Sequence, residues 1–400
     1  MNLRTGYPFW LINSGLPANY PKLEQAIKTD VVIIGGGISG ALTAYHLINA
    51  GINCIVVDAR TIGLGSTCAS TSLLQYEIDK PLSKLSLQIG IKAASQAYHL
   101  CSNAIDNIKK IASEIHYPDF EKHNSLFFAA FKKDVQLLKD EYSVRKKAGF
   151  DVSYLDADAL KKQYNFDAPA AILSAKGATI DAYLFTHALH KASIKKGLQV
   201  FDRTAVSNIE YFKNGTKLTC ENGCVIRSKK IVNASGYEIK EFIDKKIVKL
   251  TSTYAIASEN IHSPNPVWKD KTLLWNTADP YLYMRLTKDN RVIIGGRDED
   301  FFSPNKRDQL IKKKTALLTK DFLKLFPSVN FIPEYSWAGT FGSTKDALPY
   351  IGLYDKTPHT YYALGFGGNG ITFSVIAAQI IRDLIIGKKN SNTALFSFSR

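Results

Sequence analysis

The sequence predicts an α/β (α+β) protein that combines a Rossmann-type nucleotide-binding domain with a discontinuous, mainly antiparallel-sheet domain. Three observations predict this fold class. Residues 30–50 read as a buried strand, a glycine turn and a helix. A second glycine-rich turn precedes a helical pattern near residue 370. Between them lie many strand-like runs separated by hairpin signals such as Asn214-Gly215 and Asn222-Gly223.

The composition is that of a globular chain with a basic excess. Of 400 residues, 45% are apolar, and 51 basic against 36 acidic residues leave a net charge of +15. The lysines occur mostly in pairs dispersed along the chain, a pattern typical of solvated surfaces, so we expect no dedicated nucleic-acid patch. A fold could still gather them, and RNA binding stays an open alternative.

Cysteine usage and hydropathy indicate a cytoplasmic protein without a transmembrane segment. Five cysteines form an odd, sparse set, as expected in a reducing compartment. Cys220 and Cys224 flank a hairpin turn and should face each other as reduced thiols, since no further metal-ligating side chains accompany them. The uncharged run 31–57 contains three consecutive glycines and several polar residues, which fits a buried β-α-β unit better than a membrane span.

The run Gly35-Gly36-Gly37-Ile38-Ser39-Gly40 matches G-x-G-x-x-G between a predicted strand and a predicted helix. Gly35 allows the tight turn, Gly37 lets the backbone approach a pyrophosphate, and Gly40 allows close helix–strand packing. The helix N-terminus offers free N–H groups to phosphates. Asp58 ends the second strand, where its carboxylate can accept a hydrogen bond from a ribose hydroxyl. The segment therefore predicts a dinucleotide site.

Three further segments favour FAD over NAD. Residues 60–67 form a small-residue loop with hydroxyls directly after the acid. In 230–236 a strand leads into small residues that let another backbone pass close to the nucleotide. In 365–372 a second glycine-rich loop opens a helix whose dipole could stabilise negative charge on a reduced flavin.

These residues carry a resemblance to the FAD-dependent amino-acid oxidase family, which groups D-amino-acid oxidase, glycine oxidase, sarcosine oxidase and γ-glutamylputrescine oxidoreductase-like enzymes. The similarity covers nearly the whole chain and includes 30–40, 234–236, the Trp-Ala-Gly-Thr-Phe-Gly segment at 337–342, the terminal glycine loop and 396–400. Trp10 and the segment 76–79 look closer to the γ-glutamylputrescine and D-amino-acid dehydrogenase branches.

The resemblance implies non-covalent FAD and oxidation of a C–N bond by hydride transfer to flavin N5, which gives an imine. Sarcosine oxidase binds its flavin through a C-terminal cysteine, and this chain has none after Cys224. The flavin performs the chemistry, so we expect no catalytic triad, and His187 and His190 are expected to be structural. Motifs and resemblance together assign cofactor contacts to Gly35, Gly37, Ile38, Ser39, Gly40, Asp58, Ala59, Arg60, Gly65, Ser66, Thr67, Val206, Ala234, Gly236, Gly339, Gly367, Gly368, Asn369, Gly370, Ile371 and Thr372.

The chain departs from the family at two positions that bear on the substrate. Glycine oxidase has a carboxylate-binding arginine where this chain has Phe341, and sarcosine oxidase has a lysine where it has Thr372. Tyr281, Tyr283 and Arg285 occupy alternate positions of a predicted strand and should share one face. Tyr283 aligns with a substrate-contacting tyrosine of glycine oxidase. Arg285 could replace the missing arginine or could form a structural ion pair, and the residues leave both open.

The expected organisation is an N-terminal lead-in at 1–28, a discontinuous Rossmann-type FAD-binding domain at 29–85, 152–245 and 335–400, and a substrate domain at 86–151 and 246–334. The expected function is oxidation of a small-molecule amine or amino acid, with O2 or a quinone as acceptor left open. The alternatives are a flavin oxidase acting on a modified transfer-RNA base, a flavoprotein without amine turnover, and an NAD-dependent dehydrogenase.

Overall fold

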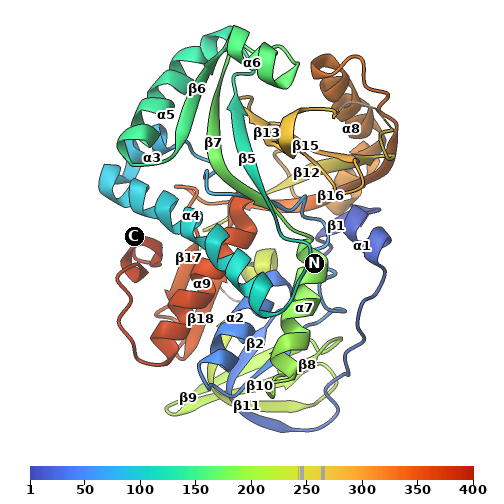
Figure 1. The fold of residues 1–400 in the computed structure, drawn as a ribbon. Helices are drawn as coiled ribbons and strands as arrows, with labels where there is room; N and C mark the ends of the chain where they lie inside the picture. The colour runs from blue at the N-terminus through green and yellow to red at the C-terminus, as the bar shows by residue number, and fades with distance from the viewer. Residues whose placement is uncertain (242, 244–246, 263–265) are drawn as a thin grey trace.

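The fold is built on two sheets, which the computed structural model describes over residues 1–241, 243, 247–262 and 266–400. Figure 1 shows one sheet layer in the upper half of the molecule and the other in the lower half. The first (blue) and last (red) parts of the chain lie together in the lower half, as the discontinuous nucleotide-binding domain requires. The predicted fold class is confirmed.

The lower sheet is the Rossmann-type layer. Residues 31–34 pair in parallel with 54–57 on one side and with 230–233 on the other. These strands are continuous apolar runs because helices cover one of their faces and a β-meander covers the other. In spatial order the strands are β8 (Gln199–Phe201), β3 (Cys54–Val57), β2 (Ile27–Ile34), β11 (Val225–Asn233), β18 (Thr360–Leu364) and the antiparallel β17 (Tyr350–Leu353).

The predicted hairpins extend this sheet. The strands β9 (Val206–Phe212) and β10 (Gly215–Cys220) join β11 in an antiparallel meander. Cys220 donates its N–H to the Cys224 carbonyl across the turn, and both thiols are free. The other face of the sheet packs on α2 (Ile38–Asn49), α7 (Ala182–Ile194) and α9 (Gly370–Ile385).

The upper sheet is almost entirely antiparallel, as predicted; among the described strands only the β5–β13 pair within it is parallel. Its spatial order is β1 (Arg4–Gly6), β16 (Pro333–Ser343), β12 (Lys249–Ser258), β15 (Val292–Glu299), β14 (Tyr283–Leu286), β13 (Leu273–Asn276), β5 (Glu121–Phe128), β7 (Ala170–Thr179) and β4 (Leu73–Gln75), with β6 (Val152–Asp156) beside β7.

Helices cover the upper sheet at both ends (Figure 1). Helix α8 packs against β12, β15 and β16. Gly90, whose φ of +84° favours glycine, separates the helix that ends at Ile89 from the helix that begins at Ile91. The helices of the first part of this layer are α3 (Leu82–Ile89), α4 (Ile91–Glu114), α5 (Val135–Lys147) and α6 (Ala157–Tyr164), followed later by α8 (Pro304–Leu325); α1 (Phe9–Ser14) lies near the N-terminus. Short 3-10 turns include η1 (Lys132–Asp134), η2 (Gly236–Glu241), η3 (Lys269–Lys271), η4 (Gly367–Asn369) and η5 (Thr393–Phe396).

Sheet membership differs from the expected domain boundaries. The segments 152–179 and 333–343 belong to the upper sheet, although 152–245 and 335–400 were expected in the nucleotide-binding domain. Residues 4–6 of the lead-in also form a strand of that sheet. Strand-like runs do not reveal which distant strand they pair with, which explains the difference. The expected boundary at 245/246 lies outside the described residues.

No helix within the described ranges is long and apolar enough to cross a membrane.

Arg285 of β14 ties the two layers together. Its side chain is buried, and Nη1 donates to the carbonyls of Ser72 (3.0 Å) and Ile180 (3.2 Å), with Thr71 O at 3.4 Å. Its guanidinium also lies 5.2 Å from the Trp10 ring centroid. Burial lowers the pKa of Arg285 to about 10, so it remains cationic at neutral pH. These contacts are those of a structural arginine.

Arg285→Met should therefore destabilise the protein by about 2–4 kcal/mol, because buried carbonyls lose their donor. Thermal melting measures this, with Arg227→Met on an exposed position of β11 as the matched control, expected within about 0.5 kcal/mol of the parent. A variant with the parent's melting temperature that only binds substrate more weakly would contradict the structural role.

Candidate functional site

A cavity of about 560 Å³ runs from the carboxyl ends of the parallel strands to the upper sheet. It begins beside Ile34 and Val57, passes the N-terminus of α2, and ends among Tyr281, Tyr283 and Phe341. This is the position at which open α/β sheets bind nucleotides. The volume is in the range of cofactor and ligand pockets.

Close backbone packing forms the first wall of this cavity. Gly35 has φ +103°, and a Cβ there would lie 2.5 Å from the Ala234 carbonyl oxygen. A Cβ on Gly40 would lie 1.8 Å from the Gly35 carbonyl oxygen. Because any side chain at either position would collide with main-chain atoms, β2, α2 and β11 can meet only where these residues are glycines.

Gly37 faces the cavity at the start of α2. The Ile38 N–H donates to Thr67 Oγ1 at 3.1 Å, and a Cβ on Gly37 would lie 2.8 Å from the same hydroxyl. Behind the turn, His190 Nε2 lies 2.9 Å from the Gly36 carbonyl, which can only accept, so this nitrogen is the donor. Burial lowers the pKa of His190 to about 4, which keeps the ring neutral and structural.

Asp58 closes the turn from the neighbouring strand. Its Oδ2 accepts the Gly36 N–H at 2.7 Å and its Oδ1 accepts the Arg60 N–H at 2.8 Å. Each carboxylate oxygen can accept a second hydrogen bond, so Asp58 can still accept one from a ribose hydroxyl. The Arg60 guanidinium pairs with Glu238, which also pairs with the Met1 ammonium at 2.7 Å. The charged groups at this end of the cavity are thus largely neutralised among themselves.

The second glycine loop is held by the segment before α3. The half-buried Asp79 accepts the Gly368 N–H at 2.8 Å through Oδ2 and the Tyr281 hydroxyl at 3.0 Å through Oδ1. Asn369 Nδ2 donates to the carbonyls of Gln75 (3.1 Å) and Glu77 (2.8 Å). These bonds fix the loop at the N-terminus of α9 against the opposite wall of the cavity.

A β-bulge shapes the far end. Between β12 and β15, Ser252 pairs with Glu299 and Tyr254 pairs with Gly296, so Thr253 faces two residues, Arg297 and Asp298. Bulges re-aim side chains, and here Asp298 lines the cavity. Its Oδ1 atom is buried and has no hydrogen-bond partner.

Electrostatics at this end are dominated by negative charge. The pKa of Asp298 is raised to about 6: burial raises it most and the charges of Asp79 and Asp279 add to this, while the Thr253 hydroxyl and the Lys314 charge lower it. Burial raises the pKa of Tyr283 above its usual range, with the charges of Asp298 and Asp79 contributing, so its hydroxyl stays protonated.

Most residues predicted from the sequence line this cavity. They are Gly35, Gly37, Ile38, Ser39, Asp58, Ala59, Arg60, Gly65, Ser66, Thr67, Val206, Ala234, Gly236, Gly339, Gly367, Gly368, Gly370 and Ile371 at the cofactor positions, and Tyr281, Tyr283 and Phe341 at the substrate positions. Gly40, Asn369, Thr372 and Arg285 do not line it. The first two support the glycine loops from behind, and the Thr372 hydroxyl donates to the Asn369 carbonyl at 3.0 Å.

Sequence reasoning missed Asp298, Thr253 and the bridge formed by Asp79. The signal for Asp298 was an acidic run directly after an apolar strand, but its direction depends on the bulge, which strict alternation does not predict. Gly295 is a second residue that shapes this end of the cavity. A Cβ there would lie 2.4 Å from the Tyr283 ring, so the glycine leaves room for the tyrosine.

The donor set fits FAD. Glycines border the cavity where a dinucleotide backbone would pass, Asp58 stands beside it, and α2 and α9 both begin at its wall. In the described parts of the chain, no cluster of three or more His, Cys, Asp or Glu residues could hold a metal ion.

Gly37→Val should abolish FAD binding, because the added side chain occupies the space beside Thr67 and projects toward the pyrophosphate path. The measurement is the FAD content of purified protein after heat release. Gly51→Ala, in the turn after α2, is the control: its φ of +76° makes the substitution cost some stability, but the added Cβ meets no other atoms, and FAD content should stay full. Full flavin loading of Gly37→Val would show that the dinucleotide does not pass this glycine.

Asp298→Asn should raise the thermal stability of ligand-free protein at pH 8 by about 1–3 kcal/mol, because the wild type carries there a half-buried carboxylate whose Oδ1 atom is buried and accepts no hydrogen bond. The folded-state pKa lies above the unfolded value, so the destabilisation develops as pH rises from about 4 to about 6. Melting curves should therefore converge at pH 4. Asp300→Asn, an exposed carboxylate paired with Lys249, is the control. A lower melting temperature for Asp298→Asn at pH 8 would show that Asp298 stabilises the fold.

Comparisons with known proteins agree with this geometry. The model of the FAD dependent oxidoreductase family matches residues 30–384. The chain is 23% identical over 390 residues to γ-glutamylputrescine oxidoreductase of Escherichia coli, covering 92% of this chain and 86% of the relative. It is 24% identical over 378 residues to glycine oxidase of Bacillus licheniformis, covering 90% and 94%.

A solved structure shows the same fold. Glycine oxidase from Geobacillus kaustophilus superposes with a TM-score of 0.77 at 19% identity, covering 93% of this chain and 99% of that one. The family match spans both sheets and both glycine loops. The chain belongs to the family of FAD-dependent oxidoreductases.

Proposed function

We propose that this FAD-dependent oxidoreductase oxidises the C–N bond of a small-molecule amine or amino acid to an imine. The single observation that carries the proposal is the reaction end of the cavity, where Tyr281, Tyr283 and Asp298 surround a space adjoining the Gly367–Gly368 loop. Relatives whose names specify an amine or amino-acid substrate support it.

The cofactor supplies the redox chemistry: when bound, FAD accepts a hydride from the carbon next to the substrate nitrogen. The chain's residues bind and orient the substrate. The hydroxyls of Tyr281 and Tyr283 stay protonated because burial raises the pKa of each. Tyr281 donates its proton to Asp79 and offers its oxygen as an acceptor, whereas Tyr283 can donate to the substrate. The nitrogen lone pair forms the C=N bond, and water then hydrolyses the imine. A general base is not required for this step if the amine arrives neutral.

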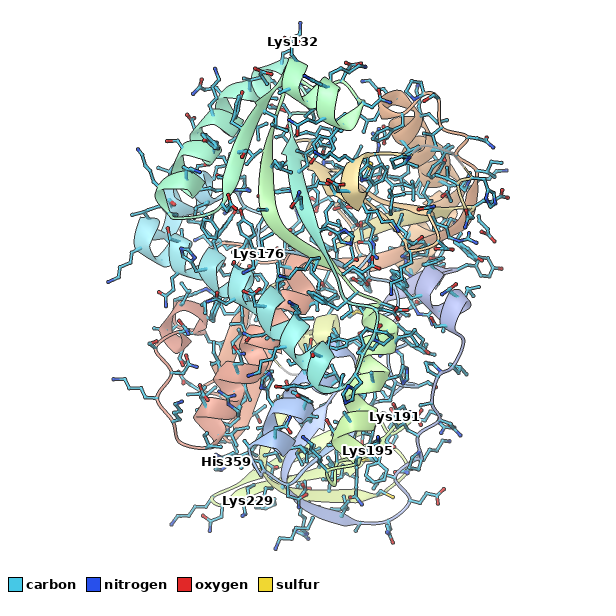
Figure 2. The ribbon with its side chains drawn as sticks, viewed as in Figure 1. Lys132, Lys176, Lys191, Lys195, Lys229 and His359 are labelled. Atoms are coloured by element: carbon cyan, nitrogen blue, oxygen red, sulfur yellow. The ribbon has the colours of Figure 1, made fainter. Side chains whose placement is uncertain are left out.

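The distribution of basic residues favours a small molecule over transfer RNA. Figure 2 labels Lys132 at one end of the molecule and Lys229 at the other, with Lys176, Lys191 and Lys195 between them. Several described lysines also form ion pairs, such as Lys176 with Asp106 and Lys229 with Asp30. Recognition of RNA calls for basic groups gathered along one continuous surface.

The protein as purified should be yellow, and anaerobic addition of its amine substrate should bleach the flavin bands. A panel of amino acids, N-methyl amino acids and amines tests this in a sealed cuvette. Acid precipitation should leave the colour in the supernatant, since we propose that the FAD is held non-covalently. A protein that carries FAD yet is bleached by no amine or amino acid, and only by an alcohol or by NADH, would contradict the proposed function.

A further inference from the structure

Among the residues that the structure describes, the reaction end of the cavity contains the Asp298 carboxylate but no cation to bind a substrate carboxylate. Arg60 is the one arginine among the described residues that line the cavity. It lies at the Asp58 end and pairs with Glu238. Arg285 is absent from the lining and is bonded to backbone carbonyls. An amino acid bound by its carboxylate would therefore find no ionic partner near Tyr283.

Asp298 forms no ion pair with any described residue, and its Oδ1 atom accepts no hydrogen bond. The nearest cationic group behind it, Lys314 Nζ, donates to the Arg297 carbonyl and to Glu299 Oε1, both at 2.6 Å, and forms no ion pair with Asp298. Asp79 adds a second negative charge nearby, but both of its oxygens already accept hydrogen bonds. Burying a carboxylate with one oxygen unsatisfied is costly, and a function at that position explains why the cost is tolerated.

A bound cation would reverse this cost. An ammonium group beside Asp298 gains a charge-assisted hydrogen bond in a partly dry site, whereas a ligand carboxylate would be repelled by Asp298. The cation at this point cannot be the nitrogen that reacts. A reacting nitrogen must be neutral to donate its lone pair to the new C=N bond, and an adjacent carboxylate would hold it protonated.

We infer that Asp298 binds the non-reacting ammonium of a diamine or longer polyamine, and that such aminoalkyl cations without a carboxylate are the substrate class. This inference rests on the proposed amine oxidation. One nitrogen, neutral, loses an N–H proton to water while its α-carbon loses a hydride to FAD, which balances two electrons and two protons. The other nitrogen remains an ammonium paired with Asp298 throughout.

A matched substrate series tests the inference. For each chain length from three to six carbons, the α,ω-diamine is compared with the ω-amino acid and the alkylamine, which replace or remove the second ammonium. Anaerobic flavin reduction gives the rate and the dissociation constant for each. We expect a diamine to bind at least tenfold more tightly than the matching alkylamine and roughly a hundredfold more tightly than the ω-amino acid.

Asp298→Asn should remove the preference for the diamine over the alkylamine, and Asp300→Asn should retain it. A second readout does not depend on turnover: the diamine should raise the melting temperature of the wild type and of Asp300→Asn but not of Asp298→Asn. The wild-type effect should weaken as pH falls below about 6, where Asp298 gains a proton. The groups facing Asp298 there are Thr253, Tyr283, Asp79, Asp279 and Lys314.

Different results would overturn the inference about Asp298 and the proposed amine oxidation. If α-amino acids bleach the flavin and diamines do not, or if Asp298→Asn keeps the full diamine preference, the inference is overturned while the proposed amine oxidation stands. If flavin-loaded protein is bleached by none of the nitrogen compounds, the proposed function itself is wrong.

Discussion

The rest of the structure depends on the contact of three backbones where β2 turns into α2. The Gly35 and Gly40 main chains and the Ala234 carbonyl approach so closely that a Cβ on either glycine would overlap main-chain atoms. This contact joins strands from residues 27–34 and 225–233 in one parallel sheet and directs the helix N-terminus at the cavity. A cofactor site formed by distant parts of the chain follows from it.

A second constraint couples this cofactor site to the upper sheet. Asp79 accepts hydrogen bonds from the Gly368 backbone and from Tyr281, so one carboxylate joins the glycine loop before α9 to the tyrosine beside the substrate space. Arg285 performs a similar task at the other side, where it binds carbonyls of the segment 71–72 and of Ile180. These polar contacts connect the upper sheet to the segments at which the chain passes to and from the nucleotide-binding layer, and the bulge places Asp298 at the cavity.

Local patterns in the sequence predicted the fold class, the glycine turns and part of the cavity lining, because these features depend on short-range backbone requirements. The grouping of strands into sheets was less accessible: the strand at 170–179 pairs with 121–128 and not with the parallel layer, and nothing within the strand itself shows this. The sequence left two roles open for Arg285, and its burial among three backbone carbonyls favours the structural one. Asp298 was missed because one extra residue in β15 changes the direction of its side chain.

The central claim is that one continuous cavity holds a whole dinucleotide, from Asp58 at one end to the Gly367–Gly368 loop at the other. The most direct test is to titrate the apoprotein separately with FAD, FMN and ADP. The quenching of tryptophan fluorescence measures binding in each titration. Because both ends of the cavity contribute contacts, FAD should bind at least a hundredfold more tightly than either of the other two. Equal affinities for FAD and FMN would contradict the account, since the glycine turn at 35–40 would then add nothing to binding.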